Sequence, residues 1–234
     1  MLYDISPPIT PTLGVWPGDT SASREILCDI HRGDSITLST LRATVHLGAH
    51  ADGPNHYGKD APAIDQRALD YYLGPCLVAH VGVARGARVD RSAVEAALDR
   101  LRVEPVERRA AEERGQPKML KLPPRLLIAT GTFPDPFRWN NDFAALDPAL
   151  VDGLHGLGVV TVGIDTPSVD LIDSKDLPAH AAFLRNDMAI LEGLALNDVP
   201  EGIYELIALP LRLVGFDASP VRAILRSMPE SIAR

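Results

Sequence analysis

Residues 44–57 read TVHLGAHADGPNHY, and this stretch decides how the rest of the chain is interpreted. It places three of the seven histidines, His46, His50 and His56, within eleven residues, with Asp52 among them. Imidazole and carboxylate groups are the ligands that zinc and related divalent ions prefer. Four ionisable groups on one segment would also be costly to bury without a cation or other partners. The spacing therefore predicts a metal site.

The same spacing predicts the local backbone. On a helix, His46 and His50 would share a face while Asp52 would point away. In an extended chain, residues 46, 50, 52 and 56 have the same parity and point to one side. The glycines and the proline of the stretch also disfavour a helix. Full extension would separate the α-carbons of His46 and His50 by ~13 Å. We therefore expect a bend near Gly48, where a residue without Cβ tolerates unusual dihedral angles.

The rest of the chain mixes short apolar runs with amphipathic segments. We expect strands where the runs are rich in Val, Ile and Leu, at 36–45, 77–83, 126–129, 159–164 and 204–209. We expect helices at 90–101 and 147–157, each beginning at an aspartate that can cap it, and at 178–186. This mixture predicts one α/β domain over residues 1–234. A nucleotide-binding fold is not indicated, since the sequence contains neither a strand-linked G-x-G-x-x-G nor a Walker-type Gly-Lys-Ser/Thr motif.

Three ligands from one segment leave a metal site incomplete, so further ligands must come from elsewhere. His180 is the best candidate, because it falls in the first turn of the helix expected at 178–186. Glu192 stands in the apolar run 188–193, where a carboxylate is costly unless it is paired or bound to a metal. The residues alone do not decide whether Glu192 is a metal ligand or is paired with another group.

Composition limits the classes of function. The 234 residues carry a formal net charge of −8, which disfavours general nucleic-acid binding because little would neutralise phosphates. No apolar run approaches the roughly 20 residues that span a bilayer, and the first residues do not resemble a signal peptide. We therefore expect a cytoplasmic protein without a membrane partner. Cys28 and Cys76 lie in apolar stretches and are expected to be buried free thiols.

The run His46-x-Gly48-Ala49-His50-x-Asp52-x-Pro54-x-His56 resembles the signature of the metal-dependent cyclase-like hydrolases. Within that superfamily, the chain is most similar to the bacterial kynurenine formamidases (arylformamidases), over nearly its whole length. Supporting segments are WPGD at 16–19, GIDTPS at 163–168, DMAILEG at 187–193 and DVPEGIYELIALP at 198–210. The last segment is specific, whereas the His/Asp motif alone identifies only the superfamily.

The resemblance implies a fold, an activity and partners. The expected fold is a mixed β-sheet with a barrel-like core flanked by helices, of the swivelling β/α/β kind. The expected reaction is hydrolysis of N-formyl-L-kynurenine to L-kynurenine and formate, in tryptophan degradation. Two divalent cations are implied, with zinc expected and manganese, cobalt or iron as alternatives. The resemblance also implies a homodimer.

The resemblance further implies a role for each candidate residue. The metal ligands would be His46, His50 and Asp52 for one ion, His180 for the second, and Asp52 and Glu192 shared by both. His56 corresponds to the catalytic acid/base, and Trp16 to part of the substrate pocket.

The chain departs from the family pattern in places. Ala181 follows His180 where a second histidine is expected, and residues 130–135 also read differently. The family is shorter near the charged segment 104–118, which we expect to be solvated surface. Two other functions stay open: a related hydrolase that opens a cyclic amide such as isatin, and a metal- or metabolite-binding protein without catalysis. A serine hydrolase is disfavoured, because the sequence has no G-x-S-x-G motif.

Overall fold

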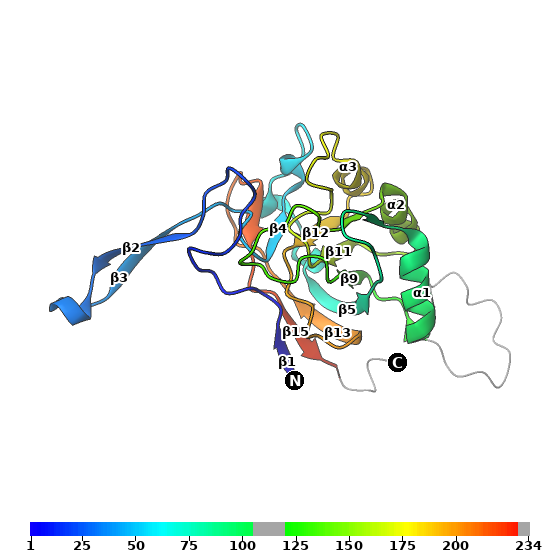
Figure 1. The fold of residues 1–234 in the computed structure, drawn as a ribbon, viewed down its shortest axis with the longest axis horizontal. Coiled ribbons are helices and arrows are strands. Elements are labelled where there is room, and N and C mark those ends of the chain that lie inside the picture. Colours follow the sequence, from blue (N-terminus) through cyan, green and yellow to red (C-terminus); the bar gives the residue numbers. More distant parts are fainter. Residues whose placement is uncertain (105–119, 229–234) are drawn as a thin grey trace.

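The computed structural model describes residues 1–104 and 120–228, and its centre is a mixed β-sheet that curls into a half-barrel (Figure 1). In order across this nine-stranded sheet, the strands are β1 (Leu2–Asp4), β15 (Ile224–Ser227), β13 (Gly202–Ile207), β5 (Leu73–His80), β9 (Arg125–Ala129), β11 (Thr161–Ile164), β12 (Ala189–Glu192), β4 (His50–Asp52) and β14 (Ala218–Pro220). The α/β class and the mixed sheet expected from the sequence are confirmed. The expectation for 104–118 falls almost entirely outside the described residues.

Four parallel strands, β5, β9, β11 and β12, form the middle of the sheet. Their side chains are buried on both faces. In β5, Leu77 and Ala79 pack toward the helices, whereas Cys76 and Val78 pack on the opposite face. Parallel strands covered on both sides read as continuous apolar runs, which explains the pattern seen in the sequence. Antiparallel strands flank this centre, with β13 beside β5 and β4 beside β12.

Three helices, α1 (Arg91–Leu101), α2 (Pro148–Gly156) and α3 (Pro178–Arg185), cover one face of the sheet (Figure 1). Asp90 and Asp147 cap α1 and α2, because each carboxylate accepts a hydrogen bond from a backbone N–H in the first turn. The residue before α3, Leu177, makes no such side-chain bond. The first N–H groups of α3 instead donate to Asp170, a residue outside the helix.

The strand expected at 36–45 is shorter than expected and lies outside the large sheet. β3 (Leu38–Arg42) pairs with β2 (Ser23–Cys28), and this hairpin extends away from the rest of the molecule (Figure 1). We call residues Ser23–Arg42 the arm; its tip contains the short helix η1 (Ile30–Arg32). Cys28 lies in the arm and is therefore half-buried rather than buried, whereas Cys76 is buried, and both thiols are free.

The remaining elements are short. Two further strand pairs join β6 (Arg88–Val89) to β10 (Ala145–Leu146) and β7 (Val103–Glu104) to β8 (Leu120–Lys121), and three 3-10 turns are η2 (Pro54–His56), η3 (Ile64–Gln66) and η4 (Leu69–Tyr71). Within the described residues, no helix has the length and apolar character needed to cross a membrane.

The bend expected near Gly48 is present. Gly48 has a φ of +58°, in the left-handed region that favours glycine, and it turns the chain between His46 and β4. Gly193, with a φ of +64°, directly follows β12 and packs against this turn. A Cβ atom at Gly193 would lie 2.2 Å from the carbonyl oxygen of Gly48. The two glycines therefore allow the ends of β4 and β12 to lie close together.

Replacement of Gly193 by alanine should destabilise the protein more than the matched change Gly158→Ala. Both glycines have positive φ angles (+64° and +84°), so each alanine costs about 1–2 kcal/mol in a left-handed conformation. Nothing lies within 4 Å of a Cβ at Gly158, whereas the clash at Gly193 should add about 1–3 kcal/mol. Urea unfolding of both variants measures the difference. Equal losses of unfolding free energy would contradict the close packing.

Candidate metal centre

The fold brings together six residues that the sequence analysis singled out. They come from five separate segments. The chain before the Gly48 bend supplies His46, β4 supplies His50 and Asp52, and the turn η2 supplies His56. The first turn of α3 supplies His180, and the end of β12 supplies Glu192. The antiparallel register of β12 and β4 sets Glu192 directly beside His50. Strand pairing therefore brings together two residues that are more than a hundred positions apart in the sequence.

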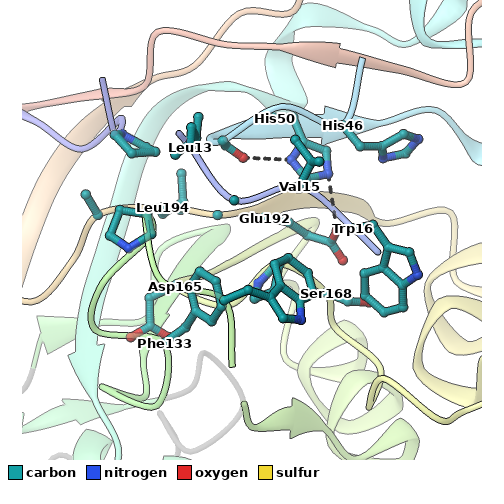
Figure 2. A pocket seen from close by; sticks show the side chains of 18 of the residues that line it. Leu13, Val15, Trp16, His46, His50, Phe133, Asp165, Ser168, Glu192 and Leu194 are labelled. Atoms are coloured by element: carbon teal, nitrogen blue, oxygen red, sulfur yellow. Dashed lines mark hydrogen bonds and ion pairs between the residues drawn. The ribbon is translucent and has the colours of Figure 1, made fainter. Parts of the chain in front are cut away.

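Two of the histidines are fixed so that one ring nitrogen faces the centre. The Nδ1 atom of His50 lies 2.8 Å from the carbonyl oxygen of Gly48, which can only accept, so Nδ1–H donates there. The Nε2 atom then faces Glu192 Oε2 at 3.2 Å and Asp52 Oδ1 at 3.5 Å, as Figure 2 shows for Glu192. A hydrogen bond at one ring nitrogen sets the tautomer and leaves the other nitrogen free for a metal.

Asp170 orients His180 in the same way, although no motif in the sequence indicated this residue. Its carboxylate accepts the backbone N–H groups of Ala179 and His180 and lies 2.9 Å from His180 Nδ1. The Nε2 atom of His180 then faces Asp52 Oδ2 at 3.5 Å and Glu192 Oε1 at 3.7 Å. Asp170 thus caps α3 and orients a candidate ligand at once. Its position two residues after the family-like segment 163–168 was a signal in the sequence, and a weak one.

The carboxylate of Asp52 lies at the middle of the cluster, with a side chain that is 0% exposed. Its Oδ1 atom faces His46 and His50, and its Oδ2 atom faces His180. Both oxygens, together with His50 Nε2, are buried without a hydrogen-bond partner. Buried polar atoms in proteins are normally satisfied. Unpartnered imidazole and carboxylate atoms that face one another fit a divalent cation, which is the partner such atoms commonly bind.

Two overlapping groups of side chains could each hold a cation. One combines His50, Asp52 and Glu192, and the other combines His46, Asp52 and His56. Asp52 belongs to both groups, as expected of a carboxylate shared between two ions. The second group includes His56, which the sequence resemblance places as an acid/base rather than a ligand.

Asp217 connects two of the histidines and was also missed. Its Oδ2 atom lies 3.1 Å from His46 Nε2 and 3.6 Å from His56 Nδ1. No pattern near residue 217 signals this position, because it depends on the pairing of β14 with β4, which sets Ala218 opposite Asp52. The contact leaves His46 Nδ1 facing Asp52 Oδ1 at 3.2 Å.

The charges in the cluster favour a cation. Burial acts to lower the pKa of His46, but the adjacent Asp52 carboxylate raises it to about 9. Burial also opposes charge on His180, yet the hydrogen bond with Asp170 and the nearby Asp52 carboxylate raise its pKa to about 10. Burial acts to raise the pKa of Asp52, but the neighbouring rings of His180 and His46 hold it well below its usual value. The carboxylate therefore stays ionised and attracts positive charge, which a divalent ion supplies.

The cluster opens into a cavity of about 490 Å³. The structure places Trp16 in its wall, 38% exposed, with ring contacts to Trp139 at 5.7 Å and Phe143 at 6.2 Å between centroids. Figure 2 shows Trp16 and Phe133 around the same space as His50 and Glu192. Phe133 lies in the segment 130–135 that departs from the family pattern, so part of the aromatic wall comes from a region the resemblance did not cover.

The chain matches a known protein family. Residues 3–171, well over half of the sequence, match the Cyclase family, which is described as "Putative cyclase". The chain belongs to the Cyclase family.

Solved structures share the fold of this Cyclase-family protein. A "potential metal-dependent hydrolase with cyclase activity" is 23% identical with a TM-score of 0.74, covering 98% of this chain and 99% of that one. A "predicted metal-dependent hydrolase" from Bacillus stearothermophilus is 23% identical with a TM-score of 0.67, covering 96% and 97%. An isatin hydrolase bound to thioisatinate is 17% identical with a TM-score of 0.71, covering 96% and 91%. At these identities the matches establish the fold.

Asp170→Asn should weaken divalent metal binding by this Cyclase-family protein about 10- to 100-fold, the usual effect of losing a partner that orients a ligand. The side-chain amide of asparagine is neutral, so it accepts a weaker hydrogen bond from His180 Nδ1–H than the ionised carboxylate does. Asp152→Asn is the matched control, because Asp152 lies on α2 and pairs with the exposed Arg185 of α3, away from His180. Competition with a chromophoric chelator measures both affinities. An unchanged affinity in Asp170→Asn would refute the orienting role.

Metal binding should release about two protons per chain near pH 7, because the ligands must be neutral imidazoles. The pKa values of His46 and His180, raised to about 9 and about 10, keep both rings protonated there in the metal-free protein. As the pH rises toward 9, His46 loses its proton before any metal binds, so fewer protons should be released on metal binding. Calorimetric titration in buffers of different ionisation enthalpy counts the protons. A proton release near zero at pH 7 would contradict this expectation.

Proposed function

We propose that this Cyclase-family protein is a metal-dependent amide hydrolase that converts N-formyl-L-kynurenine to L-kynurenine and formate, in tryptophan degradation. The main support is the buried cluster of imidazole and carboxylate groups, with unpartnered atoms, at the base of an aromatic-lined cavity. The fold shared with proteins described as metal-dependent hydrolases is consistent with this activity.

We propose that the cluster holds two divalent cations, with zinc the first candidate. The residues that would hold them are His46, His50, Asp52, His180 and Glu192. Bound there, divalent ions would lower the pKa of a water and polarise the substrate carbonyl. Each oxygen of Glu192 faces a different imidazole, and one of them also accepts the backbone N–H of Val169 at 2.7 Å. That bond fixes the carboxylate between the two histidines.

His56 is proposed to move the proton in the reaction. It stands beside His46, with ring centroids 4.2 Å apart, and its side chain is 35% exposed. Burial lowers its pKa, and the neighbouring His46 acts in the same direction, so the ring is neutral at pH 7. A neutral imidazole can accept a proton from the attacking water and then deliver it to the amide nitrogen as the C–N bond breaks. The proton on nitrogen makes the aryl amine a competent leaving group.

The lining of the cavity favours a substrate with an aromatic ring and an ammonium group. Trp16, Phe133 and Trp139 offer ring faces and edges for an aryl group. Three further acidic residues beyond Glu192 also line the cavity, namely Asp19, Asp165 and Asp198. Among the residues that the structure describes, no lysine or arginine lines it. N-formyl-L-kynurenine carries both an aryl ring and an ammonium group.

Isatin is the rival substrate, since an isatin hydrolase shares the fold. Isatin is neutral and would make no use of the acidic lining. The test compares kcat/KM for N-formyl-L-kynurenine, for its analogue without the α-amino group, and for isatin. We expect the first to be highest and the analogue to lose at least about tenfold, or 1.4 kcal/mol. Faster turnover of isatin would overturn the substrate assignment while leaving the metal-dependent hydrolase in place.

His56→Ala should lower kcat by about 10²- to 10⁴-fold, the usual contribution of a general acid or base. Its metal content should stay close to that of the native protein if His56 is not a ligand. His155→Ala is the control for loss of an imidazole away from the cluster, on α2. Metal analysis and steady-state rates are measured on the same preparations. Loss of metal together with activity would make His56 a ligand, as the second group of side chains allows.

A further inference from the structure

Asp165 is a buried acidic residue in the wall of the cavity, and no step of the proposed reaction involves it. It directly follows β11, and the parallel pairing of β11 with β9 sets it beside Thr130, which directly follows β9. Ligand sites in sheets with parallel strands gather at the carboxyl ends of those strands, where both residues lie. Among the described residues, the two groups of side chains that could hold a cation do not include Asp165. Its contacts indicate a different role.

The Asp165 carboxylate accepts three hydrogen bonds from one loop. Its Oδ2 atom accepts the backbone N–H groups of Thr130 at 2.9 Å and of Gly131 at 2.8 Å. Its Oδ1 atom accepts the Thr130 hydroxyl at 2.7 Å. Gly131 has a φ of +65°, in the left-handed region, and successive N–H groups turned in this way form a concavity that binds an anion. The carboxylate therefore occupies a site that the loop backbone builds around it.

A directed chain of hydrogen bonds extends from Asp165 to the far end of the loop. An ionised carboxylate only accepts, so the Thr130 hydroxyl donates to Asp165 and accepts from the Thr132 hydroxyl at 2.8 Å. The Thr132 hydroxyl in turn accepts the backbone N–H of Ala144 at 2.8 Å. Thr132 and Ala144 are buried, where the low dielectric constant strengthens such a chain. We call residues 130–144 the wall loop, and this chain joins its first residue to its last.

The wall loop carries three packed aromatic rings, those of Phe133, Trp139 and Phe143. Their centroids lie 5.5 to 6.2 Å apart with interplanar angles of 75° to 87°, the edge-to-face geometry that aromatic pairs favour. Phe133 and Trp139 line the cavity. Figure 2 shows Phe133 and Asp165 in the same part of its wall. The position of both cavity-lining rings therefore depends on a loop that Asp165 holds.

The wall loop also fixes Trp16, which comes from the N-terminal part of the chain. The backbone N–H of Gly14 donates to the carbonyl oxygen of Pro136 at 2.8 Å. A Cβ atom at Gly14 would lie 2.9 Å from that oxygen, so the two segments are in close contact. The centroids of the Trp16 and Trp139 rings lie 5.7 Å apart with an interplanar angle of 82°. These two residues are the only tryptophans of the sequence.

We propose that Asp165 is a positioning residue, which holds the wall loop so that its rings select substrates with an aryl group. It acts through Phe133 and Trp139 rather than on the bond that breaks. The selection of an aryl substrate rests on the proposed function, whereas the positioning of the loop does not. Residues 130–135 depart from the family pattern, so the wall loop is where this chain can differ from its relatives in substrate.

Two substitutions release the loop in different ways. In Asp165→Asn, the side-chain NH₂ group replaces one acceptor, so two donors face each other. Thr130→Val keeps both backbone N–H donors but breaks the chain at its first hydroxyl, and Thr130→Ser restores that hydroxyl. Thr161→Val is the matched control, because Thr161 donates a buried hydroxyl to the carbonyl of Tyr71 from the other end of β11.

The first measurement is near-ultraviolet circular dichroism of the full chain, to which tryptophan rings contribute when they are rigidly packed against each other. Asp165→Asn and Thr130→Val should lose most of the signal that Trp16 and Trp139 give as a pair, which Trp139→Phe defines. Thr130→Ser and Thr161→Val should keep it. A signal that either releasing variant retains overturns the inference. If far-ultraviolet spectra show that Asp165→Asn does not fold, Thr130→Val decides the case.

The second measurement is the steady-state hydrolysis of N-formyl-L-kynurenine, with metal content determined on the same preparations. Asp165→Asn and Thr130→Val should raise KM at least about tenfold, or 1.4 kcal/mol, with kcat and metal content close to native. A structural defect that reached the metal centre would lower kcat and metal content as well. A lower kcat at native KM overturns the selection of an aryl substrate by the loop.

The two measurements separate this inference from the proposed function. If the native protein does not hydrolyse N-formyl-L-kynurenine, the proposed function fails and the selection of an aryl substrate fails with it. The circular dichroism of the two tryptophans still decides whether Asp165 positions the wall loop. If the native protein is active and the tryptophan signal survives both releasing substitutions, the proposed function stands and this inference fails.

Discussion

The organisation of this protein depends on one buried carboxylate. Asp52 is enclosed among His46, His50 and His180, and neither of its oxygens has a hydrogen-bond donor of its own. An ionised carboxylate in such a place is costly unless positive charge accompanies it. Protons on the imidazoles supply that charge when no metal is bound, and divalent cations would supply it as well, because imidazole and carboxylate atoms are the ligands that such cations bind. The burial of Asp52 is therefore best understood as the cost of building a metal site.

The fold places each group around Asp52 by an ordinary structural device. The bend at Gly48 and the close approach of Gly193 bring β4 beside β12, so that His50 and Glu192 become neighbours. Asp170 caps α3 and in the same contact fixes the tautomer of His180. None of these devices is specific to one substrate. We expect substrate specificity to depend on the cavity wall, where aromatic rings and acidic side chains gather.

Much of this arrangement could be predicted from the sequence, for physical reasons. Buried parallel strands and Asp-capped helices have strong local signals, and the parity of 46, 50 and 52 with a glycine between them indicated a bent strand. Asp170 and Asp217 could not be predicted, because their roles come from helix capping and from the β14–β4 register rather than from local pattern. The strand expected at 36–45 forms in part, as β3, but its place in an exposed hairpin could not be predicted, since its apolar residues resemble buried ones. The ligand roles of His46, His50, Asp52, His180 and Glu192 stay predictions, and so does the acid/base role of His56.

We propose that the cluster around Asp52 binds divalent cations. Elemental analysis of the purified full chain, by mass spectrometry after exhaustive dialysis against metal-free buffer, tests this proposal. We expect stoichiometric divalent metal, zinc foremost and close to two ions per chain, and its loss in Asp52→Ala when folding is verified by circular dichroism. A folded native protein that retains no divalent metal, and takes up none when zinc, manganese, cobalt or iron is supplied, would refute the proposal.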